Sequence, residues 1–254
     1  MTESRVAVVT GAALGIGKAI AAKFLQEGYR TFALDLDAQS LAETSLELSN
    51  AGEFFTESFD ATDEGSVAEC FESILSRAGR IDILVNNAGG SGAVSQSIEE
   101  ISLKDWERVV NFNLKSTFLC IKAVVPSMKK TGWGRIVNMA SMAGRSRSIF
   151  GGAPYAASKA AVIGLTRQTS KDLGPFGITI NAVAPGLIIS GARIEDYWNN
   201  KKTPEERNDV LSRTPMRRPG TPSDIAAMVA YLVSEDASFV TGSVFDVNGG
   251  FWVG

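Results

Sequence analysis

The chain has 254 residues, of which 44% are hydrophobic and 21% are charged, and its formal net charge is -3. A weakly acidic chain without a long run of one sign does not favour nucleic acid or an anionic membrane surface as its main partner. The chain has no histidine and only two cysteines, which excludes Ser-His-Asp triads and HExxH metal sites and disfavours a cysteine zinc site or a disulfide framework.

Short apolar segments alternate along the chain with segments of helical periodicity. Strands that are apolar throughout are typical of a sheet buried on both faces, and strand–helix alternation implies parallel strands with right-handed crossovers. The predicted fold is therefore α/β, a Rossmann-type doubly wound parallel sheet of seven strands with helices on both faces, in a single domain spanning residues 1–254. We expect strands at residues 6–9, 31–34, 54–59, 81–85, 135–139, 178–183 and 244–247, and helices at 15–27, 41–48, 67–75, 103–128, 155–173 and 225–232.

Residues 187–222 form the least regular part of the chain. This segment is polar and contains Pro204, Pro215 and Pro219. Long irregular segments inside a compact domain often carry function. We therefore expect residues 187–222 to cover a site as a mobile substrate lid.

A glycine-rich turn joins the first predicted strand to the first predicted helix. Gly11, Gly15 and Gly17 permit a tight turn that lets the backbone approach a pyrophosphate, and the start of the helix offers free N–H groups and a positive dipole end. The spacing G-x-x-x-G-x-G differs from the commonest dinucleotide fingerprint. Its position directly after an apolar strand nevertheless predicts a phosphate-binding turn.

Asp35 ends the second predicted strand, about twenty residues after this turn, where a carboxylate would bind the adenosine ribose hydroxyls of NAD. A 2′-phosphate there would meet the negative charges of Asp35 and Asp37, and no Lys or Arg occurs at positions 12–14 or 36 to receive it. The sequence therefore predicts NAD in preference to NADP. Asp35 could also cap the next helix, and the two roles are compatible.

Tyr155 and Lys159 stand four residues apart in a helix-forming run, so their side chains share one face of the helix. A free tyrosine has a pKa of about 10, and a neighbouring cation favours the phenolate and lowers that pKa. The pair is thus a candidate general acid/base that needs no histidine. The same spacing is common by chance, and a packed aromatic ring beside a solvated amine is the alternative interpretation.

The motifs, in their order and on these elements, resemble those of the short-chain dehydrogenase/reductase family over nearly the whole chain. The resemblance is to its compact branch, which includes 3-oxoacyl reductases. The matching residues are Thr10 to Gly17, Asn86-Asn87-Ala88-Gly89, the tetrad Asn113, Ser141, Tyr155 and Lys159, Pro185-Gly186, and Asn248-Gly249-Gly250.

The resemblance implies hydride transfer between NAD and a secondary alcohol or ketone. Tyr155 would then be the acid/base, and Lys159 would lower the pKa of Tyr155 and hold the nicotinamide ribose. Ser141 would hydrogen-bond the reacting oxygen, and Asn113 would hold a water that links Lys159 to solvent. Without the resemblance, Ser141 is an ordinary serine in a turn and Asn113 a polar helix residue that is satisfied locally.

The resemblance also implies a set of cofactor contacts. Asp60 and Ala61 would flank the adenine, Asn87 and Gly89 would border the adenosine side, and Ile188 would lie near the nicotinamide carboxamide. The full set is Gly11, Leu14, Gly15, Ile16, Gly17, Asp35, Asp60, Ala61, Asn87, Gly89, Tyr155, Lys159, Pro185, Gly186 and Ile188.

Substrate choice is expected to come from residues 90–94, 142–150 and 187–198, together with Ser141. Three arginines in or beside these segments are candidates for binding an anionic group of the substrate, namely Arg145, Arg147 and Arg193. The alternative is that these arginines are solvated or lie at a subunit contact. No metal site is expected.

The expected partner is a small alcohol or ketone, and the resemblance implies a homotetramer. A cytoplasmic location without membrane attachment is expected, because no signal peptide or membrane-spanning apolar run is visible. Two other functions remain open: a 3-oxoacyl-thioester reductase, whose expected NADP preference Asp35 puts in doubt, and a nucleotide-binding regulator without catalysis. An epimerase of the extended branch is disfavoured, because few residues follow Gly186 to build a substrate domain.

Overall fold

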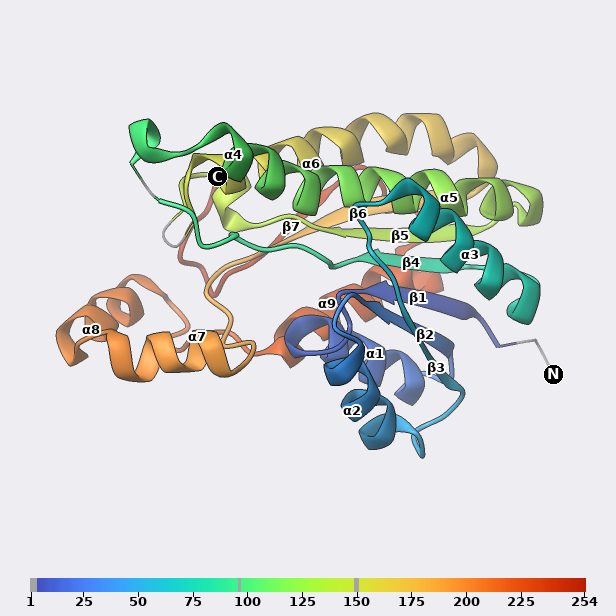
Figure 1. The fold of residues 1–254 in the computed structure, drawn as a ribbon, viewed down its shortest axis with the longest axis horizontal. Coiled ribbons are helices and arrows are strands. Elements are labelled where there is room, and N and C mark those ends of the chain that lie inside the picture. Colours follow the sequence, from blue (N-terminus) through green and yellow to red (C-terminus); the bar gives the residue numbers. More distant parts are fainter. Residues whose placement is uncertain (1–3, 96, 149–150) are drawn as a thin grey trace.

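The computed structural model describes residues 4–95, 97–148 and 151–254, and the side chain of Arg193 lies outside the described part. Its centre is a parallel sheet of seven strands in the order β3-β2-β1-β4-β5-β6-β7 (Figure 1). The predicted α/β fold with a doubly wound parallel sheet is confirmed. The strands are β1 (Val6–Thr10), β2 (Arg30–Asp35), β3 (Phe54–Ser58), β4 (Ile83–Asn86), β5 (Gly134–Met139), β6 (Ile178–Pro185) and β7 (Val244–Val247).

Helices cover both faces of the sheet (Figure 1). One face carries α1 (Gly15–Gln26), α2 (Ala38–Leu48) and α9 (Pro222–Val233). The other face carries α3 (Glu64–Ala78), α4 (Leu103–Val110), α5 (Ser116–Thr131) and α6 (Ala153–Leu173).

The apolar strands are explained by this double covering. In β1, Val6 and Val8 pack into the core beneath α3 and α5, whereas Ala7 and Val9 pack into the core beneath α1 and α9. Successive side chains of a strand point to opposite faces, so a strand between two helical layers must be apolar at every position.

The chain changes direction across the sheet at β1. This strand pairs with β2 on one side and with β4 on the other, so the loops at the carboxyl ends of β1 and β4 diverge. Ligands of open α/β sheets bind in the crevice outside the strand ends at such a switch point. The glycine turn follows β1 at this place.

Two parts of the chain differ from the sequence-based expectation. The predicted helix over 103–128 is α4 and α5 joined by one π-helical turn, η2 (Asn111–Lys115). The segment 187–222, expected to be irregular, contains α7 (Ala192–Asp196), the π-helical turn η5 (Tyr197–Lys201) and α8 (Pro204–Arg213). In Figure 1 α7 and α8, in orange, extend beyond the strand ends at the left.

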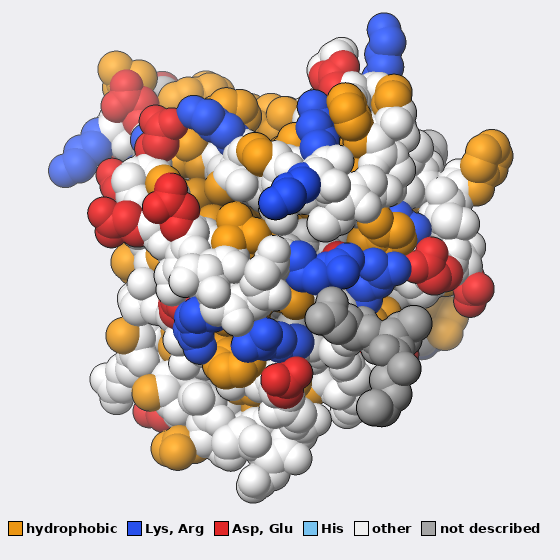
Figure 2. All heavy atoms as spheres, turned by 90° about the vertical axis from the view of Figure 1, so that its right-hand side faces the viewer, with side chains coloured by type: hydrophobic (Ala, Val, Ile, Leu, Met, Phe, Trp, Pro, Cys, Tyr) orange, Lys and Arg blue, Asp and Glu red, His pale blue; other side chains and the backbone are white. Residues whose placement is uncertain are grey.

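The opposite end of the sheet, where the strands begin, faces the viewer in Figure 2. Lys and Arg side chains gather in the middle of this face, with Asp and Glu around them. Arg5 and Arg80 pair there with Asp82, which is fully buried and also accepts a hydrogen bond from the Val6 N–H at 2.9 Å. These charges fix the starts of β1 and β4.

Within the described ranges, no helix combines the length and apolar character needed to cross a bilayer.

Candidate active site

A cavity of about 1360 Å³ lies outside the carboxyl ends of the strands. It brings together most of the residues that the sequence singled out. Gly17, Asn113 and Arg145 do not line it. The predicted residues that do line it are Gly11, Leu14, Gly15, Ile16, Asp35, Asp60, Ala61, Asn87, Gly89, Ser141, Arg147, Tyr155, Lys159, Pro185, Gly186 and Ile188.

The start of α1 opens into this cavity without a side-chain cap. Leu14 occupies the N-cap position, makes no capping hydrogen bond, and the first turn contains no acidic residue. By contrast, side chains cap α2, α3, α4, α8 and α9. The first N–H groups of α1 are therefore available to an anion, and the helix dipole favours negative charge there.

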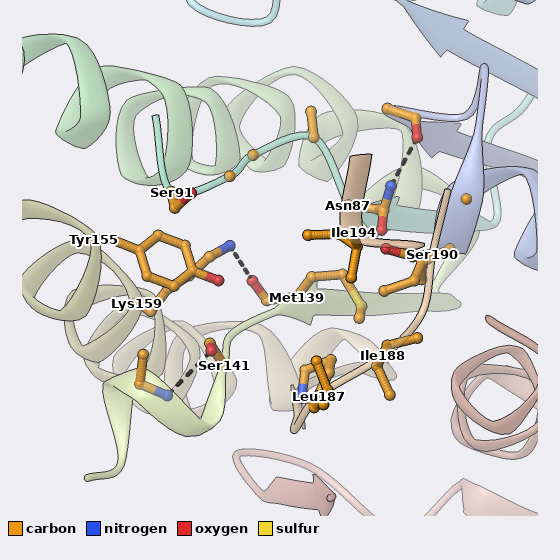
Figure 3. Close-up of a pocket in the computed structure, with 18 of the residues that line it drawn as sticks. Asn87, Ser91, Met139, Ser141, Tyr155, Lys159, Leu187, Ile188, Ser190 and Ile194 are labelled. Atoms are coloured by element: carbon orange, nitrogen blue, oxygen red, sulfur yellow. Dashed lines mark hydrogen bonds between the residues drawn. The ribbon is translucent and has the colours of Figure 1, made fainter. Parts of the chain in front are cut away.

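Close packing explains the glycines of this turn. Gly11 and Gly15 have φ values of 63° and 58°, which favour glycine. A Cβ on Gly17 would lie 2.1 Å from the carbonyl oxygen of Gly11, so α1 could not approach the turn with any larger residue there. The Asn87 amide donates to the carbonyl oxygens of Gly11 (2.8 Å) and Thr10 (3.1 Å), and Figure 3 draws one of these two hydrogen bonds. Asn87 thereby ties the end of β4 to the glycine turn.

Asp35 is held in place at the end of β2 by two backbone groups. Its carboxylate accepts hydrogen bonds from the N–H groups of Ala13 and Asp37, both at 3.0 Å. The cap of α2 is Asp37, which accepts from the Ser40 N–H at 3.1 Å. Asp35 therefore does not cap α2, and its carboxylate lines the cavity beside the glycine turn.

Asp60 follows β3 and lines the same end of the cavity. One of its carboxylate oxygens accepts hydrogen bonds from the N–H (2.8 Å) and the hydroxyl (2.7 Å) of Thr62. This Asx-type turn sets the backbone of Asp60 and Ala61 at the cavity wall.

Tyr155, Ser141 and Lys159 converge at the other end of the cavity (Figure 3). Tyr155 and Lys159 come from the first turns of α6, and Ser141 follows β5 and caps the short helix η3 (Met142–Gly144) by accepting from the Ala143 N–H at 3.1 Å. Burial raises the pKa of Tyr155, and a hydrogen bond with Ser141 lowers it in part. The tyrosine is thus a protonated donor at neutral pH in this arrangement.

Lys159 is almost completely buried, with 4% of its surface exposed. Its ammonium donates to the carbonyl oxygen of Met139 at 2.6 Å (Figure 3) and lies 5.9 Å from the centre of the Tyr155 ring. Desolvation lowers the pKa of Lys159 to about 8. A proton can therefore leave this amine at a pH only slightly above neutral.

Asn113 lies behind the cavity, inside the π-helical turn η2, and is fully buried. Its amide donates to the carbonyl oxygens of Gly90 (2.9 Å) and Val109 (2.8 Å), and its side-chain oxygen accepts from the Gly90 N–H (3.0 Å). The side chain thus fixes the backbone after β4, which packs against Lys159: a Cβ on Gly89 would lie 3.3 Å from the ammonium. The sequence did not suggest this role.

The three candidate arginines have different surroundings. Arg145 contacts Asp246 of β7 and Gly254 in the C-terminal segment, residues 248–254, and does not line the cavity. Arg147 is exposed and lines it. The side chain of Arg193 is outside the described part, as are Ile149 and Phe150 of the segment expected to choose the substrate.

Several lining residues were not predicted individually. Ser91, Ile194 and Tyr197 lie within segments expected to choose the substrate. Val210, Leu211 and Thr214 come from α8 and its C-cap, in the segment expected to form a lid, and Phe251 directly follows the Asn248-Gly249-Gly250 motif. In the described part of the chain, no group of Cys, Asp and Glu could hold a metal ion.

Comparison with known proteins finds relatives that are similar over nearly the whole chain. The family model described as enoyl-(acyl carrier protein) reductase matches residues 11–252. The chain is 40% identical to (2S)-((R)-hydroxy(phenyl)methyl)succinyl-CoA dehydrogenase subunit BbsD of Thauera aromatica, over 98% of this chain and 96% of the relative. It is 38% identical to a 3-oxoacyl-(acyl-carrier-protein) reductase of Thermotoga maritima, over 98% of each chain.

A further relative and a solved structure name their cofactors. The chain is 37% identical to a 2-dehydro-3-deoxy-L-rhamnonate dehydrogenase (NAD(+)) of a Sphingomonas species, over 97% of this chain and 94% of the relative. A crystal structure of a variant actinorhodin polyketide ketoreductase with NADPH superposes with a TM-score of 0.90, at 35% identity over 98% of this chain and 97% of the other.

Proposed function

Because the chain belongs to the short-chain dehydrogenase/reductase family and is an oxidoreductase, we propose that it transfers a hydride between NAD and a secondary alcohol or ketone. The observation that carries this proposal is the convergence of Ser141, Tyr155 and Lys159 in one cavity with the uncapped start of α1. A proton-transfer group and a pyrophosphate-binding turn are the two parts that such a reaction needs.

The residues present fit a dinucleotide. The free N–H groups at the start of α1 would hold the pyrophosphate, Asp35 the adenosine ribose, and Asp60 and Ala61 would flank the adenine. Asn87, Gly89, Pro185, Gly186 and Ile188 would line the remaining length. When bound, the nicotinamide supplies or accepts the hydride.

The proton chemistry belongs to the protein. Ser141 would hydrogen-bond the reacting oxygen and orient it toward Tyr155. In ketone reduction the Tyr155 hydroxyl would donate its proton to that oxygen, and in alcohol oxidation the phenolate would accept it. Lys159 would stabilise the phenolate and bind the nicotinamide ribose, while Asn113 holds the adjacent backbone.

The preference for NAD over NADP rests on Asp35. Its carboxylate lines the cavity beside Ala13, and the positions around it, Leu14 and Leu36, offer no cation for a 2′-phosphate. The name of one relative includes NAD(+), and a solved structure of the same fold is of a ketoreductase with NADPH. The cofactor preference therefore depends on local charge rather than on the fold.

We also propose how the chain is organised around the site. Residues 1–254 would act as one domain, and residues 187–222 as its substrate lid, because η5 and α8 supply Tyr197, Val210 and Leu211 to the cavity wall. A homotetramer and a cytoplasmic location remain part of the proposal. The latter fits two free, buried thiols, Cys70 and Cys120.

An anionic substrate is a narrower proposal that concerns Arg147. Arg145 is engaged elsewhere, which leaves Arg147 as the candidate with a described side chain that lines the cavity. Replacing Arg147 with Ala should raise the KM for a keto acid about tenfold and leave the KM for an uncharged ketone unchanged. If Arg147→Ala and the wild type have the same KM for the keto acid, Arg147 does not bind an anionic group of the substrate.

A second candidate function is reduction of 3-oxoacyl thioesters. Two relatives are named for acyl thioester substrates, and the same Tyr155 chemistry would serve. A nucleotide-binding regulator without catalysis has no supporting observation here, because Ser141, Tyr155 and Lys159 are all present at the cavity.

One experiment tests the proposal. Purified protein is assayed for reduction of NAD and of NADP with a panel of secondary alcohols, and in reverse with ketones and a 3-oxoacyl thioester. Tyr155→Phe should lower kcat at least a hundredfold without loss of folding. A mutant as active as the wild type would refute the role of Tyr155, and faster turnover with NADP would refute the cofactor assignment.

A further inference from the structure

Two cavities meet beside Ser141, and a thin layer of side chains separates them. The second cavity, of about 510 Å³, lies between η3, α8 and the C-terminal segment, residues 248–254. Four residues line both cavities, and we call them the partition. They are Met142, Arg147, Val210 and Phe251.

Phe251 occupies its place in the partition because the C-terminal segment folds into a turn. The Asn248 amide donates to the carbonyl oxygen of Trp252 at 2.8 Å, and its side-chain oxygen accepts from the Gly250 N–H at 2.8 Å. The Phe251 N–H donates to the carbonyl oxygen of Asn248 at 3.2 Å. The turn therefore fixes the backbone that carries the Phe251 ring.

Arg145 fastens the end of this turn to the loop that carries Ser141. Its guanidinium donates to the carbonyl oxygen of Gly254 at 2.6 Å, lies 3.2 Å from the Asp246 carboxylate, and stacks 4.8 Å from the centre of the Trp252 ring. Its side chain is only 17% exposed. A planar guanidinium can serve a carboxylate, a carbonyl and an aromatic ring at once, which lysine cannot.

We propose that Phe251 is a specificity-determining residue that limits the length of the substrate, and that Arg145 is the positioning residue that holds Phe251 there. The proposal rests on the proposed ketone reductase activity. A substrate whose reacting carbon lies at Tyr155 and Ser141 extends toward the partition, three residues of which are apolar. Short chains end before Phe251, and longer ones meet its ring.

The second cavity is suited to receive a longer chain once the ring is removed. Its charged lining residues are largely paired, Lys202 with Glu206 at 3.7 Å and Arg213 with Asp209 at 2.9 Å. Because these charges are paired with one another, the apolar surfaces of the partition and of Trp252 are left to contact a flexible chain. We therefore assign the class of accepted substrates as unbranched ketones, with Phe251 setting the longest.

The test compares unbranched methyl ketones from 2-butanone to 2-decanone with wild type, Phe251→Ala and Phe251→Trp. Wild-type kcat/KM should rise with chain length and then fall. Phe251→Ala should move the optimum to longer ketones, by about two- to fourfold in kcat/KM for each methylene that gains room, chiefly through KM. Phe251→Trp should move it to shorter ones. Val253→Ala, on an 85% exposed neighbour that lines neither cavity, should leave the profile unchanged.

The positioning role of Arg145 is tested first by a measurement that does not depend on enzyme activity. Hydrogen exchange of residues 248–254 should speed up at least tenfold in Arg145→Met and less in Arg145→Lys, which keeps the charge beside Asp246. In the ketone series, Arg145→Met should move the optimum to longer ketones, as Phe251→Ala does, because the ring is no longer held in place.

The outcomes separate the two proposals. If no variant, wild type included, turns over any ketone, the proposed function falls, and the exchange experiment still decides whether Arg145 fixes the segment. If ketones are reduced but Phe251→Ala and Phe251→Trp keep the wild-type length profile, the specificity role is overturned. Unchanged exchange in Arg145→Met overturns the positioning role.

Discussion

Lys159 stands out among the residues of the site because it is a buried cation with little direct compensation. Its ammonium donates a hydrogen bond to the Met139 carbonyl oxygen at 2.6 Å, and burial lowers its pKa from the ordinary 10.5 to about 8. The folded state therefore binds its proton less tightly than the unfolded state does. A residue that weakens the fold in this way is retained for function.

We predict that Lys159→Met abolishes turnover, weakens NAD binding and raises the free energy of unfolding at pH 7 by about 1 to 3 kcal/mol. Below pH 8 the lysine is charged in both the folded and the unfolded state. The wild type then bears the full cost of burying the ammonium, and the change to Met removes all of it. Between pH 8 and 10.5 the folded lysine loses its proton first, and the wild type gains stability as the pH rises. Urea unfolding at pH 7 and pH 10 measures the difference.

The control for this prediction is Lys171→Met, an exposed lysine near the end of the same helix, which should change stability by less than about 0.5 kcal/mol. A gain for Lys159→Met that is as large at pH 10 as at pH 7 would contradict the explanation by charge burial. If Lys159→Met binds NAD with the wild-type Kd, Lys159 does not contact the nicotinamide ribose as proposed.

Asp35→Asn tests the cofactor assignment mainly through charge. Asparagine keeps one oxygen, which can accept the Ala13 N–H, and it loses the acceptor of the Asp37 N–H together with the negative charge beside the ribose site. We predict that the ratio of kcat/KM for NADP over NAD rises about tenfold, equivalent to 1 to 2 kcal/mol of like-charge repulsion near a protein surface. Steady-state kinetics with both cofactors measures it.

Asp37→Asn is the matched control for Asp35→Asn. Asparagine caps a helix as well as aspartate does, so α2 should keep its cap on the Ser40 N–H. A smaller change in the cofactor ratio than that of Asp35→Asn is expected. If both variants change the ratio equally, general surface charge and not Asp35 selects the cofactor.

At the level of single residues, the sequence indicated which groups reach the cavity better than which groups support it. Tyr155 and Lys159 were predicted from their spacing and Ser141 from the family resemblance alone, and the structure brings the three together. The sequence could not distinguish Arg145 from Arg147. Their difference arises because the C-terminal segment folds back onto Arg145, a contact between distant parts of the chain that no local pattern records.

At the level of elements, the π-helical turn η2 is the feature with the clearest consequence. It interrupts the predicted long helix and carries Asn113, whose side chain makes three hydrogen bonds to the backbone of Gly90 and Val109. Single-turn π insertions often occur at functional sites. Here the insertion directs a helix side chain into the loop after β4.

We predict that Asn113→Ala lowers the free energy of unfolding by about 2 to 4 kcal/mol, because buried backbone groups of Gly90 lose their partners. It should also lower kcat, since Gly89, next to the Gly90 that Asn113 holds, packs against Lys159. Chemical denaturation and steady-state kinetics measure both. Asn111→Ala, an exposed residue of the same turn, should change stability by less than about 0.5 kcal/mol. If Asn113→Ala and Asn111→Ala are equally stable, the hydrogen bonds of Asn113 do not stabilise the loop after β4.

The helix α8 shows a signal that sequence reasoning passed over. Thr203 and Glu206 form a capping box, with Pro204 at the first helical position. This pattern predicts a helix start, but the low apolar content of residues 204–213 and the neighbouring prolines favoured an irregular segment. The π-helical turn η2, in contrast, could not be predicted, because the sequence from α4 through η2 to α5 is typical of one continuous helix.

At the level of the whole molecule, the sheet was predictable because its physics is local and repetitive. Apolar strands between helical segments require burial on both faces, and parallel pairing follows from the crossovers. The strand order and the register, such as Val8 beside Leu84, depend on the whole packing and came only with the structure. The site at the switch point then follows from the fold.

Exposed aromatic side chains on α4 and α5 argue for assembly. Trp106 and Phe118 are 38% and 49% exposed, and the neighbouring α6 exposes Ala157, Ala160 and Gly164. Aromatic side chains beside a stripe of small residues allow two copies of these helices to pack closely, as in the homotetramer that we propose.

We predict that the wild type has a mass in solution of four times the 27.0 kDa chain, and that Phe118→Glu reduces it to two chains or one. Gly164→Leu should do the same without unfolding the chain, because a Cβ there meets no atom within 4 Å while the larger side chain keeps a second helix at a distance. Light scattering coupled to size exclusion measures the mass. Leu46→Glu, on the 79% exposed Leu46 of α2, is the control and should leave it unchanged. Tetramers from both Phe118→Glu and Gly164→Leu would show that α5 and α6 do not form the interface.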